Sequence, residues 1–549
     1  MRKLPRRRFL KRTGQAALLS SLDAGARTPC VAFPAVRTES RRARPNILFL
    51  MTDQQRFDTI HALGNPHIFT PHLDRLVQRG IAFTNAYSTC PVCVPARTTI
   101  RTGCEPPTTR IFSNSPSRPA KGQAADMEGR CGPYLARVLR SLGYRTFGIG
   151  KFHTPGRWDL DIGYEVHLHS EELYATPEQR RRDAYAAWLH KNHPYLDYIE
   201  GLMGERTEMY YMPQLSPEPA EATVEGWAAA KACEEILRSD RRPFFGFVSF
   251  IGPHPPFAPP IPFNRIYDPD HMPDSIKGDL SVDHADEQIP FMNRLVWAED
   301  ISDGRARVLK ARYYGEITYI DMCIGRILEA LEARPDSENT LICFFADHGD
   351  HLGDHHAWQK ESFFEASCHI PYLVSWPAEL PGGRRRADLV CLTDLFGLAT
   401  SAAGRRELRQ GIDLLGLCKG KSAGREELYG WYGEPGTLRF KAMVRRGEWK
   451  YIYIANGGRE QLFNLKEDPN ELRSLAAEKP RVLADLKRRA IAACRHPGAK
   501  DALEGDTFKA FPYTKLVRPR RIYQFDRSRG IKGFPKHPSE VLRKFGYRF

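Results

Sequence analysis

Short apolar runs alternate with amphipathic segments along the first two thirds of the chain. The runs at 46–51, 244–250 and 340–345 are almost wholly apolar, which is typical of strands buried on both faces of a parallel sheet. The segments at 220–237 and 308–333 place apolar residues at helical spacing. The alternation predicts an α/β fold, in which a large mixed, mostly parallel sheet is sandwiched by helices.

Local signals define the elements between these runs. Thr70 is expected to be the N-cap of a helix, Pro71 to occupy its first turn, and Gly80 to end it. A second helix is expected over 132–142, and a strand over 144–148. These elements continue the alternation of strands and helices along the chain.

The pattern changes after residue 400, where the apolar runs become shorter. Strands are expected at 441–445, 450–454 and 461–464, followed by a helix at 480–493. This order predicts a smaller C-terminal α+β subdomain built on a short antiparallel sheet. The predicted divisions are a main domain at 45–400, the subdomain at 401–499 and a basic tail at 500–549.

The net charge of +15 is concentrated at the two ends of the chain. Residues 1–45 carry 12 basic and two acidic side chains, and residues 500–549 carry 13 basic and five acidic ones. The intervening part is slightly acidic, so no nucleic-acid partner is expected. No apolar run is long enough to span a membrane.

The N-terminus has the features of an export signal. Three arginines at 6–8 precede Phe9, Leu10 and Lys11, a short apolar stretch follows, and Ala-Gly-Ala at 24–26 fits a cleavage site. We expect residues 1–26 to be a twin-arginine signal peptide, recognised by the twin-arginine translocase, and residues 27–44 to be a linker. The mature protein is then exported, to the periplasm or beyond. The alternative is a basic disordered arm.

Two acid-containing pairs follow predicted strands. Asp53 and Gln54 come directly after the first strand, and Asp347 and His348 come after a late one. Ligands of α/β sheets gather at the carboxyl ends of strands, where these side chains can converge on one divalent cation. The alternative is that each pair only caps a helix or forms a turn.

A cysteine opens a predicted helix at Cys93, with Pro95 in its first turn and Arg97 one turn further along. A helix N-terminus attracts anions, and Arg97 can reach back to the same anion. The residues alone allow either a thiol of low pKa or an ordinary buried cysteine. The 12 cysteines show no paired zinc spacing.

The stretch from Pro91 to Gly103 resembles the signature of the formylglycine-dependent sulfatases, within the alkaline phosphatase superfamily. The resemblance implies an alkaline-phosphatase-like fold. It also implies that a formylglycine-generating enzyme oxidises Cys93 to formylglycine (3-oxoalanine). Cys90 lacks the following Pro and Arg at the right offsets, so the register selects Cys93.

Further segments of the chain are similar to the family's pattern in the same order. By this resemblance, Lys151 and Lys360 bind sulfate oxygens, His153 is a base, and His254 protonates the leaving oxygen. Arg97 holds the modified residue together with the cation. The implied activity is the hydrolysis of sulfate esters.

The resemblance implies a metal site formed by Asp53, Gln54, Cys93, Asp347 and His348. Calcium is the ion expected from the family. Many relatives carry a carboxylate in place of Gln54 and an Asn in place of His348, and the imidazole nitrogen makes a softer ion conceivable.

Two other functions compete with this interpretation. Formylglycine-dependent phosphonate monoester or phosphodiester hydrolases share the signature, but they usually carry neutral hydroxyl residues where this chain has Lys151 and His153. A sulfated-glycan binding protein with a degenerate site would not need these residues. The expected substrate is a sulfated small molecule or carbohydrate. The tail arginines Arg518, Arg520, Arg521 and Arg529 could contact further sulfates or simply be solvated.

Overall fold

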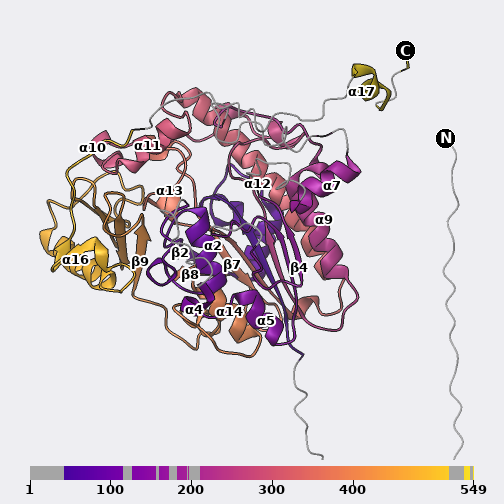
Figure 1. Ribbon diagram of the computed structural model, residues 1–549, viewed down its shortest axis with the longest axis horizontal. Helices are drawn as coiled ribbons and strands as arrows, with labels where there is room; N and C mark the ends of the chain where they lie inside the picture. The colour runs from indigo at the N-terminus through magenta and orange to yellow at the C-terminus, as the bar shows by residue number, and fades with distance from the viewer. Residues whose placement is uncertain are drawn as a thin grey trace, which may run out of the picture. The chain divides into compact units, whose positions relative to one another are not determined.

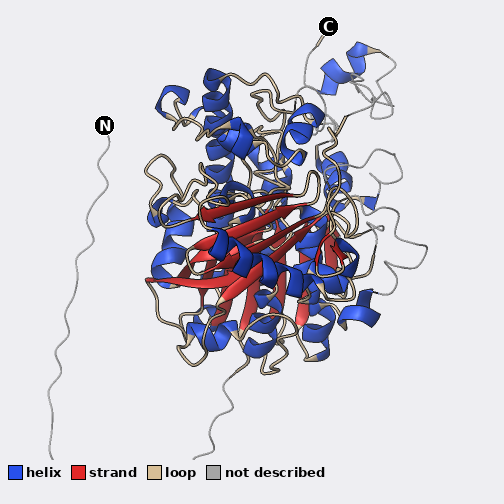
Figure 2. Ribbon diagram, turned by 90° about the vertical axis from the view of Figure 1, so that its left-hand side faces the viewer, coloured by secondary structure: helices blue, strands red, loops and turns tan. Residues whose placement is uncertain are grey.

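A twisted sheet of eight strands lies at the centre of the protein, with helices on both faces (Figure 2). The computed structural model describes residues 43–114, 127–155, 160–171, 182–193, 196, 210–517, 537–544 and 548–549. The strand order is β4-β3-β5-β1-β6-β7-β2-β8. The bounds are β1 Asn46–Thr52, β2 Ile81–Tyr87, β3 Arg145–Gly150, β4 Val166–His169, β5 Phe244–Ser249, β6 Thr340–Ala346, β7 Tyr372–Ser375 and β8 Arg384–Cys391.

Parallel pairing dominates this sheet, as the apolar runs predict. β1 lies between β5 and β6 and pairs with both in parallel. Only β7 runs against its neighbours β6 and β2 in this sheet of the described residues. The predicted mixed, mostly parallel sheet is therefore confirmed.

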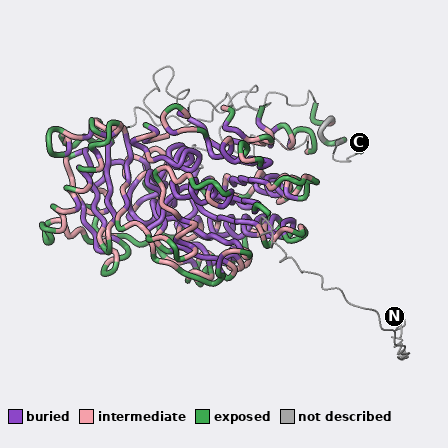
Figure 3. Tube along the Cα trace, turned by 90° about the horizontal axis from the view of Figure 1, so that it is seen from below, coloured by how far each residue is buried: buried purple, intermediate pink, exposed green. Residues whose placement is uncertain are grey.

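Successive residues of β1 point to opposite faces of the sheet and enter two separate cores. Phe49 packs edge-on against Phe245 and Phe345, with ring centroids 5.5 and 5.7 Å away. Leu48 and Leu50 face the other core. Figure 3 shows buried residues through the interior of the protein and exposed residues mainly at its periphery.

One face of the sheet is covered by α1, α7, α9 and α12, and the other by α2, α5, α14 and α15. The bounds on the first face are α1 Pro71–Arg79, α7 Ala184–Asn192, α9 Val224–Leu237 and α12 Asp303–Glu332. Those on the second are α2 Cys93–Thr102, α5 Leu135–Ser141, α14 Asp394–Ala402 and α15 Leu414–Cys418. The other α-helices among the described residues are α3 Pro106–Thr109, α4 Met127–Cys131, α10 Leu280–Asp283, α11 Gln288–Leu295, α13 Glu365–Cys368 and α17 Pro538–Lys544.

Helix ends differ from the sequence prediction where a cap overrides the local pattern. α12 begins five residues before the predicted start at 308, because the Ser302 hydroxyl accepts a hydrogen bond from the N–H of Arg305. Thr70 does precede α1, but its hydroxyl does not cap the helix. The carboxylate of Asp321 in α12 accepts the N–H groups of His72 and Leu73 instead, at 3.1 and 2.7 Å. A tertiary contact therefore caps α1.

A second, four-stranded antiparallel sheet stands beside the first, in the order β12-β11-β10-β9. Its bounds are β9 Glu427–Tyr432, β10 Lys441–Arg446, β11 Trp449–Ile454 and β12 Arg459–Asn464. α16, Pro480–Cys494, packs on this sheet (Figure 1). The predicted small antiparallel unit is confirmed, while the domain boundaries at 400 and 499 stay predictions.

The C-terminal tail packs on the body of the protein as far as the structure describes it. The short strands β13, Leu503–Glu504, and β14, Thr507–Phe508, pair with each other. Beyond them the Tyr513 hydroxyl donates to Glu287 at 2.7 Å, and Arg294 donates to the carbonyl of Leu516 at 2.8 Å. The predicted signal peptide, most of the linker and the four tail arginines lie outside the described residues. No helix among those described is long and apolar enough to cross a membrane.

Candidate active site

The strand register brings the two acid-containing pairs together. Thr52 and Ala346 are partners at the carboxyl ends of the parallel strands β1 and β6. Asp53 and Asp347, the next residue of each strand, therefore lie side by side, and both are fully buried. The structure thus brings Asp53 close to Asp347 and His348, while the convergence of both pairs on one cation stays a prediction.

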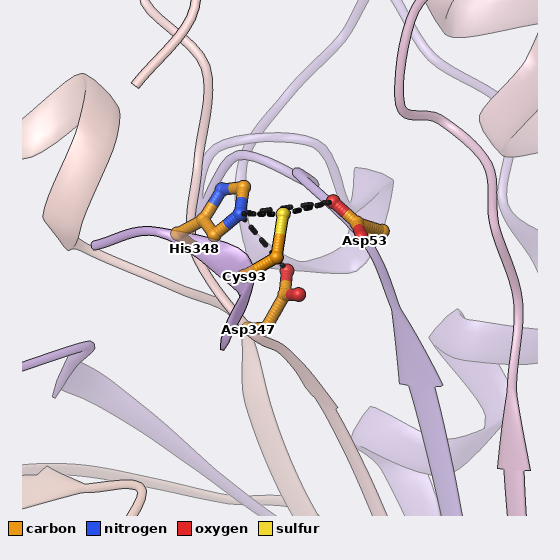
Figure 4. Close-up of side chains that lie close together, drawn as sticks. All are labelled: Asp53, Cys93, Asp347 and His348. Atoms are coloured by element: carbon orange, nitrogen blue, oxygen red, sulfur yellow. Dashed lines mark hydrogen bonds and ion pairs between the residues drawn. The ribbon is translucent and has the colours of Figure 1, made fainter. Parts of the chain in front are cut away.

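Cys93 is the first residue of α2, and its side chain points toward those of Asp53, Asp347 and His348 (Figure 4). Its Sγ lies 3.2 Å from Nε2 of His348 and 3.7 Å from Oδ1 of Asp53. Ligand atoms of Asp53, Cys93, Asp347 and His348 all lie within 4.8 Å of one another. The N-terminal end of α2 adds its favourable potential for an anion at Cys93.

Arg97 holds the two carboxylates in a fixed orientation. Its NH2 donates to Oδ2 of Asp53 and its Nε to Oδ2 of Asp347, both at 2.8 Å. Its NH1 donates to the Ser249 hydroxyl at 2.9 Å and to the carbonyl of Lys151. The Oδ1 atoms of both aspartates are left facing Nε2 of His348, at 3.7 and 3.6 Å.

This donor set fits a divalent cation. Nδ1 of His348 lies 3.0 Å from the carbonyl oxygen of Gly349. Because a carbonyl only accepts, Nδ1 carries the proton, and in the neutral ring the lone pair of Nε2 faces the carboxylates. Two carboxylate oxygens, an imidazole nitrogen and the Cys93 side chain form a small buried group of possible ligand atoms.

Two lysines contact different members of the group. Lys151 Nζ lies 2.6 Å from Oδ2 of Asp53, and Lys360 Nζ lies 3.3 Å from Sγ of Cys93. Lys360 also donates to Oε1 of Gln54 at 2.5 Å, and Nε2 of Gln54 donates to Asp350. Gln54 thus lies beside the group, but its amide oxygen contacts Lys360, and its role as a ligand stays a prediction.

The buried charges shift one another's pKa. Burial opposes ionisation of Asp53, but Lys151 and Arg97 outweigh it and hold the pKa of this carboxyl well below its usual value. Burial and the adjacent Asp53 raise the pKa of Asp347. Burial and Asp53 also oppose the Cys93 thiolate, yet Lys151, Lys360 and His348 bring the pKa of this thiol well below its usual value. The pocket therefore favours negative charge at residue 93.

The two predicted proton-transfer histidines come from different loops. Nδ1 of the buried His254 lies 2.8 Å from the carbonyl of Pro255, and the charge of His254 contributes to the lowered pKa of Asp53. His153 has a left-handed backbone with φ of 46°, and its N–H donates to Glu171 at 2.6 Å. Its buried Nδ1 makes no hydrogen bond among the described residues.

Several residues of the site were not singled out from the sequence. Ser249 ends β5 and contacts Arg97, Glu171 holds the loop of Lys151, and Asp350 accepts from both Gln54 and Tyr211. Asp350 could have been found, because it lies three residues after Asp347 in an acid- and histidine-rich run. The other contacts join distant loops, for which one sequence holds no signal.

A buried cation site with flanking lysines at the strand ends suits the hydrolysis of an anionic ester. The family described as Sulfatase matches residues 45–404, and the family described as N-sulphoglucosamine sulphohydrolase, C-terminal, matches residues 353–494. The choline-sulfatase of Rhizobium meliloti (strain 1021) is 30% identical over 458 residues, which cover 80% of this chain and 84% of that protein. The arylsulfatase of Clostridium perfringens (strain 13 / Type A) is 28% identical over 452 residues, 79% of this chain and 90% of that one.

A solved structure shares the fold. The phosphonate monoester hydrolase of Agrobacterium radiobacter superimposes with a TM-score of 0.68 at 24% identity, over 82% of this chain and 96% of that one. At this identity the likeness shows the fold alone. With the family matches, it confirms the alkaline-phosphatase-like architecture. The chain belongs to the sulfatase family and is a sulfuric ester hydrolase.

A pair of buried carboxyls anchors the loop that carries His254. Glu225 of α9 accepts the N–H of Gly252 at 3.1 Å, and Glu316 of α12 accepts the N–H of Ala258. Burial and the neighbouring Glu225 raise the pKa of Glu316 well above its usual value, and burial raises the pKa of Glu225. The folded protein therefore keeps Glu316 protonated at a pH where the unfolded chain ionises it.

We expect Glu316→Gln to flatten the pH dependence of stability. A carboxyl with a raised folded pKa favours folding at low pH, and this contribution is lost as pH rises above the unfolded value of about 4.3. The thermal unfolding midpoint of the wild type should therefore fall more steeply than that of the variant between about pH 5 and about pH 8. Glu329→Gln, at an exposed position of the same helix, should follow the wild type. Parallel curves for all three proteins would contradict this assignment.

Proposed function

We propose that this protein hydrolyses sulfate esters with a formylglycine made from Cys93. The observation that carries the proposal is the position of Cys93, at the first residue of α2 and between Lys360, His348 and Asp53. The hydrated aldehyde supplies one hydroxyl to attack sulfur and a second whose deprotonation lets sulfate leave. A formylglycine-generating enzyme is therefore a required partner.

The basic side chains of the pocket bind and orient the sulfate group. Lys151 and Lys360 are both nearly inaccessible to solvent and both lower the pKa of the Cys93 thiol, and we propose that each donates to a different sulfate oxygen. Arg97 is engaged by both aspartates and the Ser249 hydroxyl. Its role is to hold the Oδ1 atoms in place and to offset negative charge that develops at residue 93.

We propose that the two histidines carry out the proton transfers of the reaction. The His254 ring lies close enough to Asp53 to affect its pKa, and we propose that it protonates the leaving alcohol oxygen. The loop of His153 begins at Lys151 and is held by Glu171, which accepts the N–H groups of Phe152 and His153. We assign His153 as the base for the second hydroxyl at residue 93.

Asp53, Asp347, His348 and the modified residue 93 would hold the cation, with Gln54 as an additional oxygen donor. The cation supplies positive charge that stabilises the alkoxide form of the nucleophile. The carboxylates favour calcium, which is the ion we propose, and the imidazole of His348 is the ligand that a softer ion would exploit.

The proposed substrate is a sulfated carbohydrate outside the cytoplasm. The twin-arginine pattern at residues 6–11 supports export, and the basic C-terminal tail supports a polyanionic partner. Because twin-arginine substrates cross the membrane folded, residue 93 would have to be modified before export. The segment before Cys93 is buried in the folded protein, which agrees with that order.

We predict that active protein carries formylglycine at residue 93. After co-expression with a formylglycine-generating enzyme, the mass of the peptide around residue 93 should show conversion of the thiol to the aldehyde. Cys93→Ala should lower kcat/KM on an aryl sulfate by at least about a thousandfold. Cys93→Ser should release about one equivalent of alcohol and then stall, because it lacks the second hydroxyl.

Cys90→Ser is the matched control, because Cys90 is equally buried and lies in the same segment. This variant should keep both the modification and the activity. An unmodified thiol in fully active enzyme, or full activity of Cys93→Ala, would rule out the mechanism.

Removal of the cation should destabilise the protein as well as inactivate it. Without the cation, the Oδ1 atoms of the two buried aspartates lose the ion that they would hold together, although Arg97 and Lys151 still pair with these carboxylates. We expect about one calcium per chain in elemental analysis, a lower thermal unfolding midpoint after chelation, and recovery when calcium is returned. His348→Ala should weaken calcium retention. Zinc or manganese in place of calcium would overturn the choice of ion, while leaving the site itself intact.

A further inference from the structure

The sulfate-binding Lys360 is presented by an unusual stretch of backbone. Gln359 and Glu361, on either side of it, both adopt left-handed conformations, with φ of 78° and 75°. For non-glycine residues each such conformation costs about 1–3 kcal/mol and persists only when the surroundings enforce it. The contacts of Gln359 and Glu361 therefore determine where the Lys360 side chain points.

The Glu361 side chain is held from two elements outside the large sheet. Its Oε2 accepts hydrogen bonds from the hydroxyl of Tyr432 in β9 and from Nε2 of Gln288 in α11, both at 2.6 Å. Its carbonyl accepts from Nζ of Lys441 in β10, which is also paired with Asp286 at 2.5 Å. The small antiparallel sheet therefore fixes both the side chain and the backbone of Glu361.

The same residue ties Lys360 to the segment that carries Cys93. The N–H of Glu361 donates to the carbonyl of Pro91 at 3.2 Å, two residues before Cys93. On the other side, Gln359 donates to the Tyr211 hydroxyl at 2.9 Å, and its carbonyl accepts the N–H of His351 at 2.8 Å. The backbone on both sides of Lys360 is thus held in place, at Glu361 by the small sheet and at Gln359 by the loop that follows β6.

We propose that Glu361 is a positioning residue for Lys360, and that Tyr432 and Gln288 act through it. The small sheet then takes part in the reaction indirectly, by setting the distance between Lys360 Nζ and residue 93. The inference rests on the proposed function, in which Lys360 binds the sulfate group. Loss of the Glu361 carboxylate leaves two donors without an acceptor and frees the left-handed turn to relax, which moves the ammonium group away from the substrate.

The test is a mutant cycle on steady-state hydrolysis of an aryl sulfate by the modified enzyme. Glu361→Ala should lower kcat/KM about tenfold to hundredfold, because a displacement of about 1 Å costs that much at a reacting centre. Tyr432→Phe should lower it by a smaller factor. The Glu361→Ala, Tyr432→Phe double variant should be no worse than Glu361→Ala alone, since both changes break one chain of contacts.

The decisive comparison repeats Glu361→Ala and Tyr432→Phe in a Lys360→Ala background. If both residues act through Lys360, neither change lowers kcat/KM further there. An equal loss in both backgrounds would overturn the inference, because the residues would then act on the fold or on residue 93. If Glu361→Ala does not fold, the comparison of Tyr432→Phe in the wild-type and Lys360→Ala backgrounds decides. An equal loss of kcat/KM in both backgrounds would overturn the inference.

Tyr429→Phe is the matched control for Tyr432→Phe. Tyr429 lies in the same strand and donates to another glutamate, Glu427, also at 2.6 Å, whereas the Glu361 carboxylate accepts from Tyr432 and Gln288. Its variant should keep wild-type kcat/KM. The two levels of the account fail in different ways. Wild-type turnover that does not respond to Lys360→Ala contradicts the role of Lys360, whereas a Lys360-dependent enzyme with additive effects of Glu361→Ala contradicts only the positioning role.

Discussion

The structure depends on one arginine that is buried between two aspartates. Asp53 and Asp347 are both inaccessible to solvent, and charged groups are buried at this depth only when they are paired. Arg97 pairs with both through their Oδ2 atoms, Lys151 adds a second positive charge at Asp53, and the two Oδ1 atoms lie near Nε2 of His348. Arg97 lies on α2, one turn after Cys93. The ion pairs that allow the two aspartates to be buried therefore also place residue 93 beside them.

The rest of the protein supports this centre from three directions. The large sheet supplies the aspartates at adjacent strand ends. Two buried glutamates on α9 and α12 hold the His254 loop. The small sheet reaches Lys360 through Glu361. In the proposed mechanism, the C-terminal sheet therefore helps to set the position of Lys360, through the hydrogen bond that Tyr432 donates to Glu361.

Elements with a strong local signal could be predicted from the sequence, and those defined by tertiary contacts could not. The apolar run of β1 and the register of Cys93 are local properties. β8 was missed because it shows no apolar pattern. It is an edge strand, and it begins with three mostly exposed arginines, Arg384–Arg386. β9 was missed because Gly430 interrupts it, where the ring of Phe363 occupies the space of a side chain. The left-handed conformation of Glu361 could not be predicted from the sequence, because the residue that adopts it is not a glycine.

The central claim is that this pocket is built for a sulfate ester, and a direct comparison of two substrates tests it. The measurement is kcat/KM of the formylglycine-containing, calcium-loaded enzyme on an aryl sulfate and on the matching aryl phosphonate monoester. With charged Lys151 and Lys360 around residue 93, the account predicts a clear preference for the sulfate. A clear preference for the phosphonate would contradict it and would identify the phosphonate hydrolase function as the correct one.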